Sequence, residues 1–269
     1  MMKLGEIEKG SAWALVTGAG SGIGRCYAQQ LAALGYNLVL AGITAQTLDQ
    51  TRDTCHIQGI EIRTVVIDLA RTDASQELFE AVQALGIEID VLINNAGIFS
   101  FLDLLQTPVE RIERIILLHD LTTTLNCRRF AERMVQRGVQ GYILNMSSYS
   151  LWMPFPGLSL YSASKAYLRS FSVAFAKEVR QCGIRVTAVC PAGVATDLYG
   201  LPRRWQQIGC KVGVLISPTN CAHRGLTALW RGRRCIVPDW WNRLWIPLCK
   251  LLPMCVLRPI RKKTMKFQK

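Results

Sequence analysis

Three features are scarce in this sequence of 269 residues, and each scarcity excludes a class of protein. None of the ten cysteines is spaced as a CxxC pair, so we expect free thiols in a reducing compartment and no metal site. Arg243, Pro247, Lys250 and Pro253 interrupt the apolar stretches near the carboxyl end, so none reaches the roughly 20 residues that span a bilayer. The first residues carry charges where a signal peptide needs an apolar run, which predicts a cytoplasmic protein.

Acidic residues are almost missing from the last part of the chain. The sequence has 32 Lys and Arg against 19 Asp and Glu, yet the first 197 residues carry a net charge of −1 and the last 72 carry +14. Asp239 is the single acid among those 72 residues. The excess therefore belongs to a terminal segment, and we predict a folded domain over 1–238 followed by a basic amphipathic extension over 239–269.

The extension has two unlike faces. At 100° per residue, Trp241, Trp245 and Leu248 gather on one side, with Arg243 and Lys250 opposite. This pattern suits peripheral binding to an anionic membrane surface, and packing against another subunit is the alternative. Nucleic acid is not expected as a partner, because the charges are mixed with bulky Leu and Trp and do not form a separate polar module.

The order of apolar runs predicts an α/β fold. Half of the residues are apolar, which excludes a mainly disordered chain. Short β-branched runs alternate with longer amphipathic segments, as in right-handed βαβ crossovers. We therefore expect a Rossmann-type doubly wound parallel sheet in a single domain. The expected strands are 12–17, 37–41, 62–67, 91–93, 142–146, 186–190 and 235–237, and the expected helices include 23–34, 74–85, 109–137 and 162–181.

A glycine-rich segment joins the first strand to the first helix, and it reads Thr17-Gly-Ala-Gly-Ser-Gly-Ile-Gly24. A backbone without side chains can approach a pyrophosphate there, and the helix N-terminus supplies N–H donors. A plain tight turn is the weaker alternative, because the glycines stand in the strand-turn-helix context that a nucleotide site requires. The segment resembles the signature of the short-chain dehydrogenase/reductase family.

Three further stretches agree with this resemblance in order and separation. They are Asp68 after the third strand, Asn94 to Gly97 after the fourth, and Pro191 with Thr196 further on. The resemblance covers about residues 11 to 200 and implies an oxidoreductase whose domain over 1–238 binds NAD(P). The implied cofactor-binding residues are Thr17, Gly18, Gly20, Ser21, Gly22, Ile23, Gly24, Thr44, Asp68, Leu69, Asn95, Ala96, Gly97, Tyr161, Lys165, Pro191, Val194 and Thr196.

The end of the second strand bears on the choice between NAD and NADP. An acid there would bind the ribose 2′-hydroxyl and repel a 2′-phosphate. This sequence has Ala41-Gly-Ile-Thr44, with neither acid nor base. Because the main barrier to the phosphate is missing, and because Thr44 or Arg25 could reach it, we expect NADP to be preferred.

Three polar residues predict the chemistry. Tyr161 and Lys165 lie four residues apart on one helix face, and Ser148 ends the preceding strand, so all three converge at the carboxyl edge of the sheet. A free phenol has a pKa near 10 and needs a nearby cation to act as an acid or base near neutrality. We predict that Tyr161 is the general acid in ketone reduction and the base in oxidation, and that Ser148 binds the substrate oxygen. The resemblance implies that Lys165 also holds the nicotinamide ribose.

One departure from the family concerns its relay asparagine, which should fall near His119 on the long helix. A lone His on a helix is more often structural, yet a neutral imidazole can hold a water as an amide does. His119 is therefore a secondary catalytic candidate. It is also the support for a rival hypothesis, a nucleotide-binding protein without catalysis that docks to a membrane or partner through its tail. A milder departure is Ala192, where the family usually has Gly.

The segments expected to border the site are strongly apolar. They cover 98–102 and 149–160, and they favour a lipophilic ketone or alcohol such as a 3-oxoacyl, keto-sphingoid or steroid compound. Plain packing is the alternative, because these segments also pair subunits in the family. The resemblance further implies a homo-oligomer, either dimer or tetramer.

Overall fold

The computed structural model describes residues 5, 7–153, 155–196, 202–211 and 213–239. The predicted extension over 239–269 lies outside these residues apart from Asp239, so its two faces stay predictions. Among the described residues, no helix is both long and apolar enough to cross a membrane.

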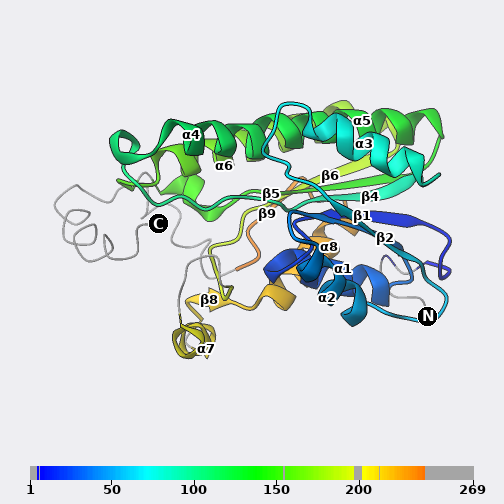
Figure 1. The fold of residues 1–269 in the computed structure, drawn as a ribbon, viewed down its shortest axis with the longest axis horizontal. Helices are drawn as coiled ribbons and strands as arrows, with labels where there is room; N and C mark the ends of the chain where they lie inside the picture. The colour runs from blue at the N-terminus through cyan, green and yellow to red at the C-terminus, as the bar shows by residue number, and fades with distance from the viewer. Residues whose placement is uncertain (1–4, 6, 154, 197–201, 212, 240–269) are drawn as a thin grey trace.

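A parallel sheet of seven strands forms the middle layer (Figure 1). The strand order is β3-β2-β1-β4-β5-β6-β9, and each neighbouring pair is parallel. The winding direction reverses between β1 and β4, which is where ligands bind in such sheets. The predicted doubly wound sheet in a single domain is confirmed. The strands are β1 (Trp13–Thr17), β2 (Asn37–Gly42), β3 (Ile62–Val66), β4 (Ile89–Asn94), β5 (Gly141–Met146), β6 (Ile184–Val189) and β9 (Cys235–Ile236).

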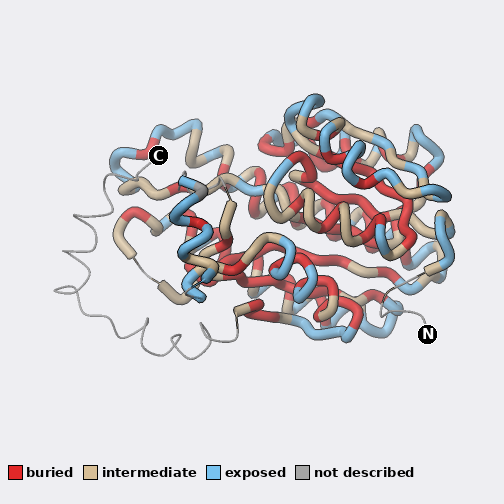
Figure 2. Tube along the Cα trace, turned by 90° about the horizontal axis from the view of Figure 1, so that it is seen from below, coloured by how far each residue is buried: buried red, intermediate tan, exposed pale blue. Residues whose placement is uncertain are grey.

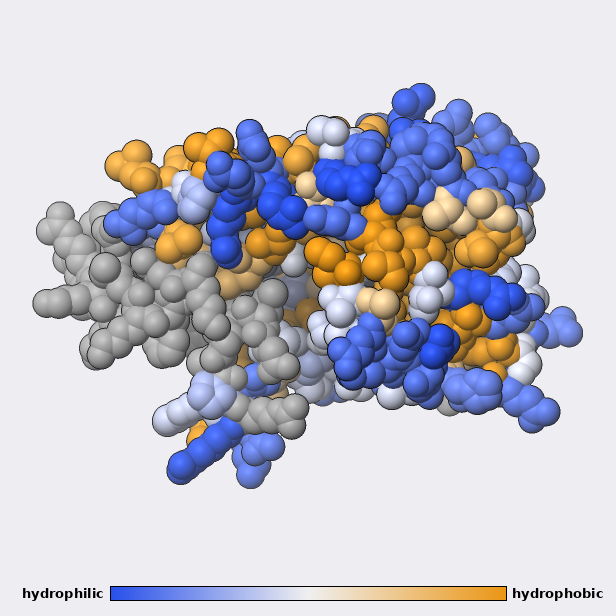
Figure 3. All heavy atoms as spheres, in the orientation of Figure 1, coloured by the Kyte–Doolittle hydropathy of each residue, from blue (hydrophilic) through white to orange (hydrophobic). Residues whose placement is uncertain are grey.

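Helices cover both faces of the sheet. In Figure 1, α3, α4, α5 and α6 lie above it, and α1, α2 and α8 lie below it. Buried chain runs through the sheet and the inner helix faces (Figure 2), and hydrophilic side chains gather on the outer helices in Figure 3. Two apolar clusters result. One lies between the sheet and α1 and includes Tyr27 and Leu31, and the other lies between the sheet and α5 and includes Phe130 and Met134. The helices are α1 (Gly22–Ala33), α2 (Ala45–Thr54), α3 (Ala74–Ala84), α4 (Val109–Ile116), α5 (Thr123–Gln136), α6 (Ser159–Glu178), α7 (Arg203–Lys211) and α8 (Pro218–Trp230).

The strand sequences explain their places in the sheet. β1, β2 and β4 are almost wholly buried, as expected for apolar strands covered on both faces. β3 stands at the edge, has no buried residue and exposes Arg63 and Val66. The buried interior strands therefore hold the sheet in the core. The carboxyl ends of these strands bring the predicted site residues to one edge of the sheet.

Three details differ from the expected elements. The predicted helix over 109–137 is two α-helices joined by a π-helical turn, Leu117–Thr122, which widens the helix at His119. α6 begins at Ser159, three residues before the expected start. A small second sheet, β7 (Gly193–Val194) with β8 (Leu215–Ile216), was not expected, and α7 lies between its strands in the chain. These last elements follow the sixth strand of the main sheet and border the site.

Candidate active site

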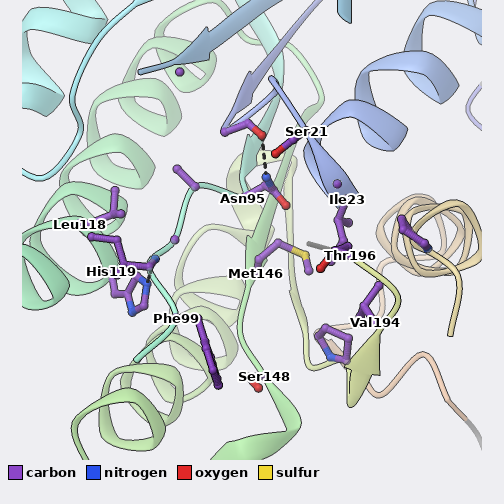
Figure 4. Close-up of a pocket in the computed structure, with 18 of the residues that line it drawn as sticks. Ser21, Ile23, Asn95, Phe99, Leu118, His119, Met146, Ser148, Val194 and Thr196 are labelled. Carbon is purple, nitrogen blue, oxygen red and sulfur yellow. Dashed lines mark hydrogen bonds between the residues drawn. The ribbon is translucent and has the colours of Figure 1, made fainter. Parts of the chain in front are cut away.

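A cavity of about 1020 Å³ lies at the carboxyl ends of the central strands (Figure 4). Its walls come from the ends of β1 to β6 and the loops that follow them, together with the π turn, α6 and α7. Most predicted site residues line it, whereas Thr17, Gly20, Gly24 and Thr44 do not. The predicted residues that line it are Gly18, Ser21, Gly22, Ile23, Asp68, Leu69, Asn95, Ala96, Gly97, His119, Ser148, Tyr161, Lys165, Pro191, Val194 and Thr196.

The glycine-rich turn leaves no room for side chains. Gly18 and Gly22 have φ values of 64° and 53°, in the left-handed region that favours glycine. A Cβ on Gly24 would stand 2.1 Å from the carbonyl oxygen of Gly18, and one on Gly20 would stand 2.4 Å from Oγ1 of Thr47. Gly20 and Gly24 therefore shape the turn from behind, while bare backbone and the start of α1 face the cavity.

Thr17 and Asn95 fasten the ends of β1 and β4 together. The Thr17 hydroxyl oxygen accepts hydrogen bonds from the N–H groups of Asn95 (3.0 Å) and Ala96 (3.1 Å). The Asn95 amide donates to the carbonyls of Thr17 (3.0 Å) and Gly18 (3.2 Å). Asn95 and Ala96 line the cavity and Thr17 does not. These hydrogen bonds hold the glycine-rich turn between β1 and β4, where the winding direction of the sheet reverses.

Arg25 braces the same turn from the α2 side. Its Nη2 donates to the carbonyl of Gly20 at 2.6 Å, and its Nε donates to Oγ1 of Thr51 at 3.0 Å. At the end of β2, Gly42 and Ile43 line the cavity and Thr44 does not. Nε and Nη2 of Arg25 are therefore used by protein contacts, and the described residues that line the cavity at the end of β2 carry no charge.

Asp68 is held by an arginine. Its carboxylate accepts hydrogen bonds from Nη1 and Nη2 of Arg114 at 3.0 and 3.3 Å and from the Ala70 N–H at 3.0 Å. Burial opposes ionisation, yet these hydrogen bonds and the Arg114 charge lower the pKa of Asp68. In the described part of the chain, no three His, Cys, Asp or Glu side chains are grouped as metal ligands.

Tyr161, Lys165 and Ser148 meet at the cavity wall. The first two lie one turn apart on α6, and the Lys165 Nζ stands 5.7 Å from the Tyr161 ring centroid. Ser148 follows β5 and accepts a hydrogen bond from the Ser150 N–H at 3.2 Å. Phe99 packs edge-on against Tyr161, with ring centroids 5.1 Å apart. Ser147 instead donates to the Lys165 carbonyl at 2.6 Å and so attaches α6 to β5.

Lys165 is the buried cation of the site. Its side chain is 4% exposed, and its Nζ donates to the carbonyl of Met146 at 3.0 Å. Burial lowers the pKa of Lys165 to about 8, against a smaller opposite effect of Asp120. Most of the Lys165 side chains therefore carry the ammonium charge at pH 7, and burying that charge lowers the stability of the folded protein.

His119 is fully buried and uses both ring nitrogens within the protein. Nε2 accepts from the Ile98 N–H at 3.0 Å, which leaves the proton on Nδ1 for Ser164 Oγ at 2.9 Å. Ser164 in turn donates to the carbonyl of Tyr161 at 2.9 Å. Burial, aided by the Lys165 charge, lowers the pKa of His119 well below its ordinary value. His119 thus links the loop after β4 to the helix that carries Tyr161. That its imidazole binds a relay water stays a prediction.

His119→Leu will destabilise the protein by about 1 kcal/mol or more, because it removes the acceptor of the part-buried Ile98 N–H. His119→Asn retains an acceptor and will lose less. The unfolded state takes up a proton at His119 below pH 6.5 that the folded state refuses, so wild-type stability falls with acid there and this contribution vanishes in both variants. Urea unfolding at pH 5 and pH 7.5 tests this; equal pH slopes in all three proteins would contradict it.

Sequence reasoning missed the contribution of α7. Gln206, Gln207, Cys210 and Lys211 line the cavity from this helix, beyond the point where the family signature fades. Its apolar positions recur at helical spacing, but that signal alone does not say which cavity the helix borders. Ile98 and Phe99 do line the cavity, as expected for the apolar segment 98–102, whereas no described residue of the other expected segment, 149–160, lines it.

Comparisons with known proteins agree on one family. The family model described as short chain dehydrogenase matches residues 12–207. A very-long-chain 3-oxoacyl-CoA reductase of Pyricularia oryzae is 35% identical over 190 residues, which is 69% of this chain and 57% of the relative. The match thus spans little more than half the length of that relative.

Solved structures give the same result. A short-chain dehydrogenase from Sphingobium yanoikuyae in complex with NADPH is 28% identical, with a TM-score of 0.75 over 87% of this chain and 92% of that chain. A short chain dehydrogenase/reductase from Burkholderia phymatum in complex with NAD is 25% identical, with a TM-score of 0.78 over 90% and 94% of the two chains.

Proposed function

The chain belongs to the short-chain dehydrogenase/reductase family, and from that premise we propose that it interconverts a ketone and a secondary alcohol with NAD(P)H on a lipophilic substrate. One observation carries the proposal: a phenol, a buried ammonium and a hydroxyl meet beside a phosphate cradle of bare backbone. Lys165 alone would also suit nucleotide binding, but a buried ammonium beside a phenol additionally favours the phenolate that proton transfer leaves, and this favours catalysis over the rival hypothesis.

The residues present fit a nicotinamide dinucleotide. The turn from Gly18 to Gly24 offers N–H groups and the positive end of α1 to a pyrophosphate, at positions where a Cβ would clash. Such a cofactor supplies or accepts a hydride when bound. Lys165 and Tyr161 line the same cavity and are suited to hold a ribose and a substrate oxygen.

The chain supplies the proton and the electrostatics. In reduction, the Tyr161 hydroxyl transfers its proton to the oxygen of the carbonyl group, and the Lys165 ammonium stabilises the phenolate left behind. The Ser148 oxygen accepts the Ser150 N–H, and in the proposed reaction its hydroxyl donates to the substrate oxygen. Oxidation reverses these steps, with Tyr161 as the base.

A long acyl chain is the substrate class that we favour. Ile98, Phe99, Leu118 and Val194 give the cavity an apolar side. The name of the Pyricularia oryzae relative, a very-long-chain 3-oxoacyl-CoA reductase, supports a 3-oxoacyl thioester over a keto-sphingoid or steroid compound.

A chain-length screen tests this proposal. We expect oxidation of NADPH with 3-oxoacyl thioesters, with kcat/KM rising by at least about tenfold from short to long chains because each buried methylene adds apolar contact. NADPH should outperform NADH, since the end of β2 presents no acid to a 2′-phosphate. Turnover of short and long chains at equal rates would contradict the lipophilic substrate, and no turnover of any ketone would contradict the oxidoreductase.

We also propose that the extension over 239–269 docks the protein on an anionic membrane, on the sequence pattern described above. The full chain is expected to sediment with liposomes that contain phosphatidylserine, and a chain ending at residue 238 is expected to stay in the supernatant. Equal sedimentation of both would refute this, and analytical ultracentrifugation of the same pair would test homo-oligomer formation and its dependence on the extension.

A further inference from the structure

A second cavity, of about 510 Å³, lies at the opposite edge of the sheet. It is bordered by the end of α6, the start of β6 and the turn that joins α8 to β9. β6 runs for six residues from this cavity toward the active site, and a strand rises about 3.3 Å per residue. The two cavities are therefore separated by about the length of one strand, and the second takes no part in the proposed reaction.

The walls of this second cavity are cationic, and we call it the basic cavity. Its charged lining residues are Lys177, Arg180, Arg185, Arg231 and Arg234, and no carboxylate lines it. Within the described ranges, none of these five forms an ion pair. Arginines elsewhere in those ranges do find carboxylates, namely Arg52, Arg63, Arg71, Arg114, Arg133 and Arg137.

The backbone that presents these cations is firmly hydrogen-bonded. The Thr187 hydroxyl donates to the Arg233 carbonyl at 2.6 Å, and the Ala188 N–H donates to the Arg234 carbonyl at 3.0 Å. Arg185 donates to the Trp230 carbonyl, and its guanidinium carbon lies 5.8 Å from the Tyr142 ring centroid. The turn and Arg185 are thus placed before any ligand arrives, which lowers the entropic cost of binding.

Helix ends explain part of this charge. α6 and α8 both end near the basic cavity, and cations favour the C-terminal ends of helices. Lys177 lies in the last turn of α6, whereas α8 has no cation in its last turn. Five cations around one concavity exceed what these helix ends explain, and they repel one another unless an anion lies between them.

We propose that the basic cavity binds the phosphate groups of a polyanionic ligand. The guanidinium groups of Arg180, Arg231 and Arg234 offer paired N–H donors whose geometry matches phosphate oxygens, and Arg185 adds a positive charge although one of its donors is used by the Trp230 carbonyl. The volume lies within the range of small-molecule sites and exceeds what a single phosphate ion needs. A soluble polyphosphate compound and the phosphorylated head group of a lipid share this chemistry.

The test uses the full chain with saturating NADPH, so that the cofactor site does not compete for the probes. Calorimetry measures binding of inorganic pyrophosphate, and sedimentation measures binding to phosphatidylcholine vesicles with and without phosphatidylinositol 4-phosphate. The variant is Arg231→Gln with Arg234→Gln. The control is Arg52→Gln with Arg63→Gln, which removes the same charge from α2 and β3.

The pyrophosphate dissociation constant is expected to rise at least about tenfold in the Arg231/Arg234 variant and to stay within about twofold in the control. A parallel loss of binding to the phosphoinositide vesicles assigns a lipid head group, and unchanged vesicle binding assigns a soluble ligand. The proposal is overturned if both double variants bind pyrophosphate like the wild type, or if the wild type does not bind it. Circular dichroism melts confirm that each variant is folded.

Discussion

Tyr161→Phe is expected to lower kcat for ketone reduction by about 10³-fold while NADPH still binds with nearly wild-type affinity. The variant removes one oxygen from a ring that is 7% exposed and packed against Phe99, so the site keeps its shape. What it loses is the proton donor beside the Lys165 ammonium, since Ser148 lies on a different element, after β5. Single-turnover kinetics and NADPH fluorescence titration measure the two effects separately.

A matched control lies on the same helix. Tyr167 is 42% exposed, and its hydroxyl contacts the Thr124 hydroxyl at 2.8 Å, away from the cavity lining. Tyr167→Phe makes the same chemical change and should leave kcat within about twofold. If Tyr161→Phe kept more than a tenth of the wild-type kcat, or if it lost NADPH binding to the same degree as turnover, Tyr161 would not be the general acid.

Local patterns in the sequence were enough to predict the architecture and one side of the site. β-branched runs separated by amphipathic helices fixed the strand positions within a few residues, since strands covered on both faces must be apolar throughout. The helical spacing of Tyr161 and Lys165 placed both on one face of α6, and parallel strands bring Ser148 to the same edge. Their roles, as opposed to their positions, stay predictions.

Contacts between distant parts of the chain could not be predicted in this way. No periodic pattern in the sequence indicates the π turn at His119. The two hydrogen bonds of the His119 ring go to Ile98 and Ser164, which lie 21 and 45 residues away in the chain. A buried network of Asn94, Asn145 and Ser172 behind the site is equally non-local. Each of these depends on the packing of three layers, which a periodic pattern does not specify.

The charge distribution was predicted only in part. The excess does lie after Asp197, but seven of its 15 cations precede Asp239, in the predicted domain over 1–238. The run Arg231 to Arg234 contributes three of these seven. In the structure, two of its arginines border a concavity with cations from α6 and β6. Only the fold reveals that these charges, distant in the sequence, face one another.

Lys165→Met is expected to make the cofactor-free protein more stable at pH 7 while it lowers kcat by at least about 10²-fold. The pKa of Lys165 is about 8 in the folded state against 10.5 for an ordinary lysine, because burial disfavours the ammonium. At pH 7 Lys165 is protonated in both the folded and the unfolded state. The shift in its pKa therefore corresponds to a cost of about 3 kcal/mol in the stability of the folded state. Methionine fills similar space without charge but loses the hydrogen bond to the Met146 carbonyl, so we expect a net gain of about 2 kcal/mol.

The pH dependence distinguishes this cause from better packing. Between pH 8 and 10.5 the unfolded state binds more protons at Lys165 than the folded state does, so the wild type gains stability from this group as pH rises. The advantage of Lys165→Met should therefore shrink steadily over that window, as urea unfolding at pH 7, 8.5 and 10 would measure. Lys177→Met, at an exposed position on the same helix, should change stability by less than about 1 kcal/mol at each pH. Two results would contradict this explanation: a Lys165→Met protein that is less stable than the wild type at pH 7, or one whose advantage is the same at every pH. Either would show that the buried Lys165 charge does not lower the stability of the folded protein in exchange for activity.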